Sequence, residues 1–259
     1  MQKGLNIYVY VLIMTGVTAL VLSFLYNVLD PIQAKNKEEA KKKSILAALP
    51  DGGAGLDFDK DVKVVVLDAK GKVKFEQKAD TKQEESDKLF TELNKRGQGV
   101  KYTKLVDIDL ALEEKFPLDQ RIYPVYLVEG KSSKSTIVAV RGNGLWDKIW
   151  GFISLENKAG KWAVSGVNFE HKAETPGLGA EIKDSKAFKE QFKGKQIYDN
   201  AGEFVSVAVV KAPKNKDWEV KSISGATVTS VGVSEMMIRG VSFYLPYLEK
   251  ISGKALSSK

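Results

Sequence analysis

The longest run of hydrophobic positions lies at the start of the chain. No charged residue occurs between Gly4 and Leu29, and the stretch from Ile7 to Leu25 is dense in Val, Leu, Ile and Tyr. As a helix, this run would be about 39 Å long, whereas the hydrocarbon core of a bilayer is roughly 30 Å thick. We therefore expect residues 1–30 to form a tilted transmembrane anchor.

A cleaved signal peptide is the alternative interpretation of this run. Such a peptide has an apolar region of about 7–15 residues, followed by a cleavage site of small residues. Here the apolar region is longer, and it continues into Asp30-Pro31-Ile32 without such a site. The pattern favours an uncleaved anchor.

After the anchor, the hydrophobic positions are spaced as in one helix and then as in short strands. Gln33–Leu49 mixes Ala, Ile and Leu with charged residues and stops at Pro50-Asp51-Gly52-Gly53, which predicts a helical stalk over residues 31–53. Three pairs of β-rich segments flank turn sequences, as in β-hairpins. They are Val62–Leu67 with Val73–Phe75, Tyr123–Val128 with Thr136–Val140, and Ile149–Leu155 with Trp162–Phe169, the last pair around a turn at Glu156–Lys161.

Further strand and helix signals complete the fold class. Val205–Val210 is another β-rich run, and helical spacing is clearest in Glu84–Leu93, Ser185–Phe192 and Thr229–Leu248. With 43% hydrophobic and 28% charged residues in 259, the chain has an ordinary globular composition. We predict an α+β protein: a single N-terminal transmembrane helix and a domain rich in antiparallel hairpins over residues 54–259.

Charge and residue usage exclude several classes of function. The net charge is +7, but the lysines are scattered among acids and no cluster of arginines with aromatic residues occurs, so we expect no nucleic-acid partner. The chain has no cysteine and one histidine, His171, which excludes disulfides, thiol catalysis and iron–sulfur ligation; we expect no metal site. Redox chemistry would therefore need a bound organic cofactor.

The segment Ser224–Ser230 is dense in hydroxyl groups among small residues, just before the last predicted helix. Ser and Thr are common helix N-caps, which is the structural interpretation. The start of a helix also offers free N–H groups and a positive dipole to a phosphate, and Gly225 lets such a ligand approach the backbone closely. A threonine hydroxyl at this point could carry the phosphate as an ester.

Ser224-Gly225-Ala226-Thr227 resembles the flavinylation motif of FMN-binding domains. In this family a flavin transferase joins the phosphate of FMN to the threonine, so the resemblance implies Thr227 as the modified residue, with Thr229 and Ser230 as supporting hydroxyls. The family has an aspartate three residues before the Ser-Gly pair; Lys221 stands there in this sequence, and Asp217 and Glu219 are out of register.

Two other segments fit a flavin site. Gly142-Asn143-Gly144-Leu145-Trp146 reads as a turn that feeds a strand, in which Leu145 or Trp146 could stack on a flat ring. Glu174-Thr175-Pro176-Gly177-Leu178-Gly179 reads as a rigid turn. In it, Glu174, Thr175 and the amides near Gly177 could face the polar edge of an isoalloxazine, with Leu178 on its face; His171 would be structural or a hydrogen-bonding neighbour.

This last loop resembles that of the C subunit of the sodium-pumping NADH:quinone oxidoreductase, and of the related G subunit of the Rnf complex. The resemblance implies an electron relay with covalent FMN inside a multi-subunit membrane complex that oxidises NADH, reduces quinone and exports sodium. No residue would then act as acid, base or nucleophile during turnover. The alternatives are an Rnf-type electron carrier and a non-catalytic, membrane-anchored binding module.

The side of the membrane is predicted differently by charge and by resemblance. Lysines follow the anchor more often than they precede it, which by itself favours a cytoplasmic domain. The resemblance implies a single-pass protein of the bacterial cytoplasmic membrane with its large domain on the outer, periplasmic side. We follow the resemblance, because the charge rule loses force for long translocated domains.

Overall fold

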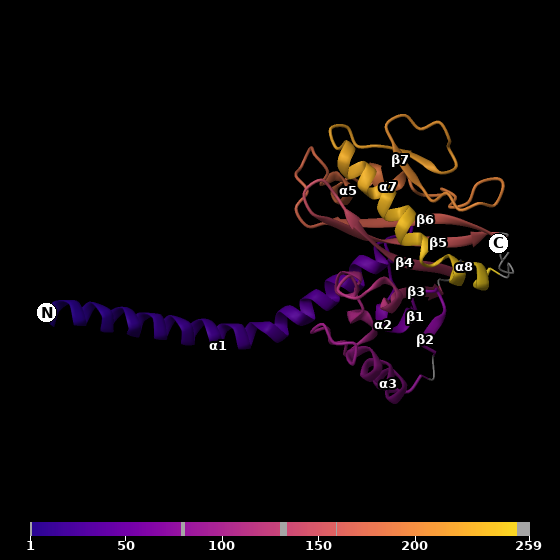
Figure 1. Ribbon diagram of the computed structural model, residues 1–259. Coiled ribbons are helices and arrows are strands. Elements are labelled where there is room, and N and C mark those ends of the chain that lie inside the picture. The colour runs from indigo at the N-terminus through magenta and orange to yellow at the C-terminus, as the bar shows by residue number, and fades with distance from the viewer. Residues whose placement is uncertain (1, 79–80, 130–133, 159, 253–259) are drawn as a thin grey trace. The chain divides into compact units, whose positions relative to one another are not determined.

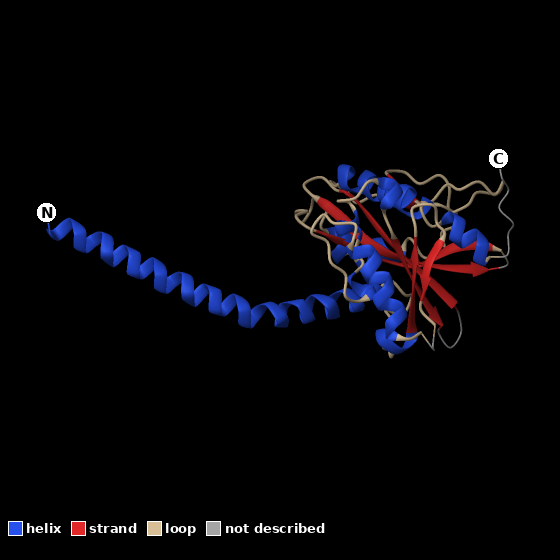
Figure 2. Ribbon diagram, turned by 60° about the horizontal axis from the view of Figure 1, so that its bottom comes forward, coloured by secondary structure: helices blue, strands red, loops and turns tan. Residues whose placement is uncertain are grey.

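A computed structural model describes residues 2–78, 81–129, 134–158 and 160–252 (Figures 1 and 2). The chain divides into two units, residues 1–41 and residues 42–259. The first unit is most of helix α1 (Gln2–Leu46). In the described part of the chain, this is the one helix long and apolar enough to cross a membrane. Its side chains from Asn6 to Leu29 are exposed, as lipid-facing residues would be, which supports the predicted anchor.

The second unit is built on a six-stranded antiparallel sheet, in the order β2-β1-β3-β4-β5-β6. The strands are β1 (Val62–Leu67), β2 (Val73–Glu76), β3 (Tyr123–Glu129), β4 (Lys134–Asn143), β5 (Lys148–Lys158) and β6 (Lys161–His171). The three predicted hairpins are therefore confirmed, although the turn of the second lies outside the described residues. The strands of the third hairpin are longer than predicted, because β5 extends to Lys158 and β6 begins at Lys161.

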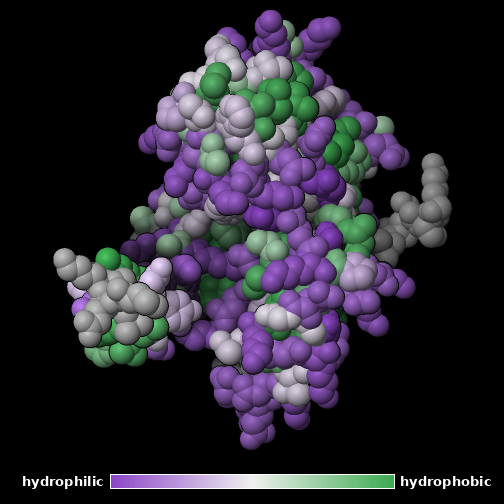
Figure 3. Space-filling view, turned by 60° about the vertical axis from the view of Figure 1, so that its left-hand side comes forward, coloured by the Kyte–Doolittle hydropathy of each residue, from purple (hydrophilic) through white to green (hydrophobic). Residues whose placement is uncertain are grey.

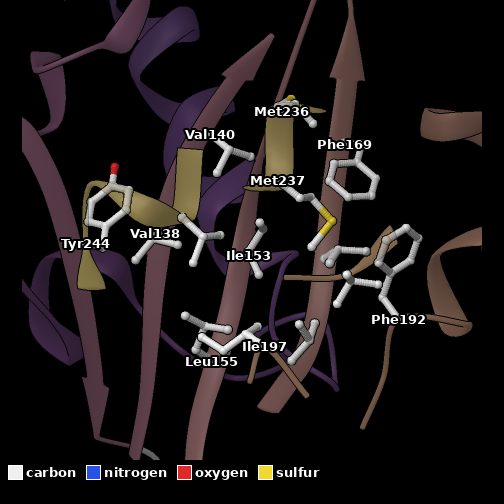
Figure 4. Close-up of a cluster of buried hydrophobic side chains, with 14 of the residues drawn as sticks. Val138, Val140, Ile153, Leu155, Phe169, Phe192, Ile197, Met236, Met237 and Tyr244 are labelled. Carbon is white, nitrogen blue, oxygen red and sulfur yellow. The ribbon is translucent and has the colours of Figure 1, made fainter. Parts of the chain in front are cut away.

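Helix α7 (Thr227–Ser242) covers one face of this sheet, and Figure 4 shows Met236 and Met237 directed at the strands. The strand side chains beneath it point to the same face because they alternate: Val138 and Val140 on β4, Ile153 and Leu155 on β5. On the opposite face, Ile137 and Phe152 pack with Ile45 and Ala48. The last turn of α1 thus packs within the folded unit, which begins at Lys42, inside the segment expected to be a stalk.

Shorter elements fill the connections. Between β2 and β3 lie α3 (Gln83–Asn94), η1 (Leu105–Asp107), α4 (Leu110–Glu113) and η2 (Leu118–Gln120), and α2 (Phe58–Asp61) precedes β1. After β6 come α5 (Glu181–Asp184), α6 (Lys186–Glu190) and the parallel pair β7 (Ala208–Val210) and β8 (Glu219–Lys221). Helix α8 (Leu245–Ile251) is the last element. The mixed α+β class is confirmed, and the predicted helix Glu84–Leu93 is α3. The parallel pairing of β7 with β8 and the short elements η1, α4 and η2 were not predicted.

Two predicted elements need correction. The expected helix Thr229–Leu248 is two helices, because Pro246 cannot donate the backbone hydrogen bond that a continuous helix requires and its ring excludes the carbonyl four residues earlier. The expected strand Val205–Val210 is limited to its last three residues, because Ser206 adopts a left-handed φ of 58° that interrupts an extended chain.

Candidate functional site

The site is organised around a buried carboxylate, that of Glu174, whose residue is 4% exposed. Oε1 accepts hydrogen bonds from the amides of Trp146 (2.9 Å) and Asp147 (3.4 Å), and Oε2 accepts one from the amide of Leu145 (3.2 Å). The hydroxyl of Thr229 donates a fourth bond to Oε2 at 2.5 Å. One side chain therefore joins the β4–β5 turn to the first turn of α7.

Hydrogen bonds set the ionisation of this group. Burial alone would raise the pKa of the Glu174 carboxyl, but the bonds from Thr229 and from the amides of the 145–147 turn favour the charged form and lower the pKa below its usual value. The carboxylate is thus an anion held by four donors of its own chain. The expected contact of Glu174 with a flavin ring stays a prediction; within the protein, Glu174 links the 145–147 turn to α7.

Glycines, which have no Cβ, allow the 145–147 turn, the loop after β6 and α7 to pack closely against one another. A Cβ at Gly144 would lie 2.5 Å from Oε1 of Glu174, and one at Gly179 would lie 2.5 Å from Oγ1 of Thr229. On the next turn of α7, a Cβ at Gly232 would lie 2.2 Å from the carbonyl oxygen of Asn143. Glycine is required at these positions because the neighbours are backbone or fixed side chains.

The loop after β6 has its own supports. The carboxylate of Glu181 accepts hydrogen bonds from the amides of Gly177 and Gly179, and the amide of Glu174 donates to Nδ1 of His171. His171 is thus a hydrogen-bonding neighbour, as expected. The sequence analysis did not predict the contribution of Glu181. The available signal was its position, four residues after Gly177 and two after Gly179.

Around this frame, several hydrophobic side chains are exposed to solvent. Trp146 is 63% exposed, and Leu145, Leu178 and Val228 are also exposed. On the face of the domain in Figure 3, hydrophobic residues gather in the upper part among hydrophilic ones. Leu145 and Trp146 belong to the turn that Glu174 holds, and the carbonyl of Leu178 accepts a hydrogen bond from Thr229. These side chains are exposed, while hydrogen bonds to Glu174 and Thr229 hold the backbone of their segments in place. A surface that binds a flat ring would have the same arrangement.

The start of α7 leaves donors available for a phosphate. Its N-cap residue, Ala226, makes no side-chain capping hydrogen bond, although hydroxyl residues surround it. Gly225 adopts a φ of 81°, which brings it against the carbonyl of Gly177. An uncapped first turn presents N–H groups and the positive end of the helix dipole to an anion.

The hydroxyl groups of this segment divide into two sets. Thr229 and Ser230 are fully buried, and both make hydrogen bonds within the protein: Thr229 to Glu174, and Ser230 from the amide of Ile223. Thr227 and Ser224 are exposed. Thr227 is the first residue of α7, so its hydroxyl lies where the helix dipole favours a phosphate.

The structure brings most of the predicted residues to one place. The 145–147 turn, the 174–179 loop and the first turn of α7 are linked by direct hydrogen bonds, and Gly225 approaches Gly177. Thr175 is exposed on the same loop, and its carbonyl accepts from the amide of Leu178. Lys221 lies on β8, where its backbone bonds the side chain of Gln191. An uncapped helix start, an exposed hydroxyl and exposed apolar side chains are the features that FMN needs, so the residues fit this group.

Comparisons with known proteins show which family this chain belongs to. The family model of the FMN-binding domain matches residues 144–242, which include all three linked segments. The C subunit of the Na(+)-translocating NADH-quinone reductase from Pseudomonas aeruginosa is 30% identical over 224 residues, covering 81% of this chain and 80% of that protein. The chain belongs to the family of these C subunits. As a member, it carries an FMN-binding domain on a membrane anchor.

Other members of this family show how far the similarity extends. The C subunit from Neisseria meningitidis serogroup A is 34% identical over 131 residues, and this chain spans half of its length. The crystal structure of the Parabacteroides distasonis C subunit superposes with a TM-score of 0.61 and 27% identity, covering 85% of this chain and 96% of that one. The expected relationship to these C subunits is thus confirmed, and the fold is shared with a solved member.

Proposed function

We propose that this chain is the electron-relay subunit of a membrane complex that oxidises NADH, reduces quinone and exports sodium, and that its FMN is esterified to Thr227. The relatives are named as subunits of a Na(+)-translocating NADH-quinone reductase. The observation that carries the proposal is the exposed hydroxyl at the first residue of an uncapped helix, beside exposed apolar side chains.

Thr227 is the acceptor that chemistry favours among the hydroxyls of this segment. An ester forms when Oγ1 of Thr227 bonds the phosphorus of FMN, with the net loss of one water between them. Thr229 is a poor candidate, because its hydroxyl is buried and already donates to Glu174. Ser224 is exposed but precedes the helix, where the donors of the first turn are not aligned with it.

The remaining residues hold the ring and shape its surroundings. Leu145, Trp146 and Leu178 present apolar surface to the ring, and the loop of Thr175 and Gly177 lies beside it. When bound, FMN supplies one- and two-electron chemistry, while the protein sets its position and potential. A covalent bond prevents its loss, which suits a domain on the outer, periplasmic side of a bacterial cytoplasmic membrane. We propose this orientation, the other subunits as partners and a flavin transferase during maturation.

Intact mass spectrometry tests the proposal. The full chain, expressed with an active flavin transferase, should gain the mass of one FMN minus water, and the Ser222–Met236 peptide should contain it. Thr227→Ala should carry no FMN, whereas the matched variant Ser224→Ala should keep it. Unmodified wild-type protein from native membranes, or a flavinylated Thr227→Ala, would contradict the proposal; an anchored binding module without flavin would then remain.

A further inference from the structure

A second concave site lies between residues 110–121, strand β4 and the C-terminal half of α7. It is a cleft of about 550 Å³, and its lining includes Asn143 from the segments predicted for the flavin site but none of the side chains predicted to contact the ring. Four cationic side chains line it: Arg121, Arg141, Lys148 and Arg239. The carboxylates in the lining are those of Glu113 and Glu114.

The carboxylates of the cleft are already matched by cations. The guanidinium of Arg96 donates hydrogen bonds of 2.7 and 2.8 Å to the carboxylate of Glu113. Arg96 itself does not line the cleft. Glu114 contacts Nε of Arg141 at 3.1 Å and Nζ of Lys148 at 3.6 Å. Arg141 and Lys148 therefore share the single negative charge of Glu114, so this group alone has a net positive charge. Arg121 and Arg239 come in addition.

The remaining two arginines add to this excess. The guanidinium of Arg121 is held by the carbonyls of Phe116 (2.9 Å) and Glu114 (3.3 Å). The side chain of Arg239 is exposed and forms no ion pair within the part of the chain that the structure describes. A concave surface with excess positive charge attracts carboxylates, and a guanidinium fixed in advance loses less entropy when it binds one.

Part of the lining of the cleft is apolar. The rings of Tyr123 and Phe243 stack at 4.6 Å, with 17° between their planes, and Ala139 and Leu110 lie beside them in the lining. Leu118 is 60% exposed at the edge. A small inorganic anion would use only the cations, whereas a peptide that combines carboxylates with an apolar side chain matches both parts of the surface.

We propose that this cleft docks an acidic segment of a partner subunit. The inference rests on the proposed membership of a multi-subunit complex and adds where a partner binds. Asn143 and Lys148, which pair across β4 and β5, line the cleft, and the four residues between them carry Leu145 and Trp146. A segment bound there contacts both ends of the turn that the flavin ring needs, so the partner sits beside the predicted redox site.

Site-specific cross-linking in native membranes tests the proposal. A photo-reactive benzoylphenylalanine at Leu118 should cross-link a peptide of another subunit that is rich in Asp and Glu, identified by mass spectrometry. With this probe in place, Arg239→Glu should lower the yield about ten-fold, because a repelled carboxylate weakens docking. Lys88→Glu, an exposed lysine on α3, should leave the yield unchanged.

Other results would overturn the proposal. These are a cross-link to lipid, to a second copy of this chain or to a segment without acidic residues, the lack of any product, or a yield insensitive to Arg239→Glu. Co-purification of other subunits with the wild-type chain reports on the proposed function separately. If none of them co-purifies, both ideas fail; if they co-purify and no acidic segment is captured, only the docking site fails.

Discussion

The hydroxyl of Thr229 donates a hydrogen bond of 2.5 Å to the carboxylate of Glu174, a residue 55 positions earlier in the chain. The same carboxylate binds the amides of the turn that presents Leu145 and Trp146. The start of α7, which carries Thr227, is therefore held in register with this turn through one side chain. Buried carboxylates of this kind fix the geometry of a site when every lone pair finds a donor.

Glu174→Gln should loosen this frame without removing the acceptor threonine. In Gln, an NH₂ group replaces one carboxylate oxygen. This NH₂ group would face the N–H of either Leu145 or Trp146, and two donors cannot form a hydrogen bond. We expect a loss of about 2 kcal/mol in the free energy of unfolding, because a buried donor loses its partner. Hydrogen exchange at residues 145–147 should become faster, measured by mass spectrometry.

The control is Glu129→Gln, which removes an exposed carboxylate that pairs with Lys63 and Lys134. Exposed pairs of this kind contribute little, so the stability of this variant should stay close to that of the wild type. Equal effects of the two variants would show that Glu174 does not organise the site.

Acid should weaken the domain through the same residue. The pKa of Glu174 is lowered in the folded protein, so the unfolded chain binds its proton first as the pH falls. Its contribution to stability is fully present above the unfolded pKa of about 4.3 and is lost as the pH falls through the lower folded value. Denaturation curves between about pH 6 and pH 3 should show a shallower pH dependence for Glu174→Gln. Parallel curves would contradict this assignment.

Gly232→Ala should destabilise the domain although alanine is the better helix former. Helix propensity alone would favour alanine by about 1 kcal/mol. However, the new Cβ would lie 2.2 Å from the carbonyl oxygen of Asn143, so α7 would have to move away from β4. We expect a net loss of about 2 kcal/mol or more in thermal or denaturant unfolding. Val231→Ala, at an exposed position of the same helix, serves as the control and should change stability by less than about 1 kcal/mol.

Trp146→Ala and Leu178→Ala should each alter the environment of the flavin while the covalent bond stays in place. Both side chains are exposed on segments held from beneath, so their loss removes contact area without opening the core. The visible absorbance and circular dichroism of the flavin should change, with an unchanged intact mass. Leu118→Ala, an exposed leucine outside the site, should leave the spectrum as in wild type. An unaltered spectrum in the first two variants would remove these residues from the ring contact.

The sequence by itself determined the elements whose signals are local. The apolar run of the anchor, the three hairpins and the Ser-Gly-Ala-Thr segment were recognisable because length, alternation and motif are properties of neighbouring residues. Pro246 was an equally local signal for the break between α7 and α8. The helical spacing of apolar residues continues on both sides of Pro246 and therefore predicted one long helix. The spacing continues because both helices pack on the same core, through Met237, Val241, Tyr244 and Leu248.

Only the tertiary structure decided which groups bind the carboxylate of Glu174 and which hydroxyls of the segment are buried. At sequence level, Glu174 was a loop residue expected at a flavin ring, and only a motif resemblance distinguished Thr227 from Thr229 and Ser230. Folding brings loops from three parts of the chain onto one carboxylate, and the rotation of the first turn of α7 buries Thr229 and Ser230 while Thr227 stays outside. Burial and hydrogen bonding between distant segments depend on how whole elements pack, and no local pattern of residues contains that information.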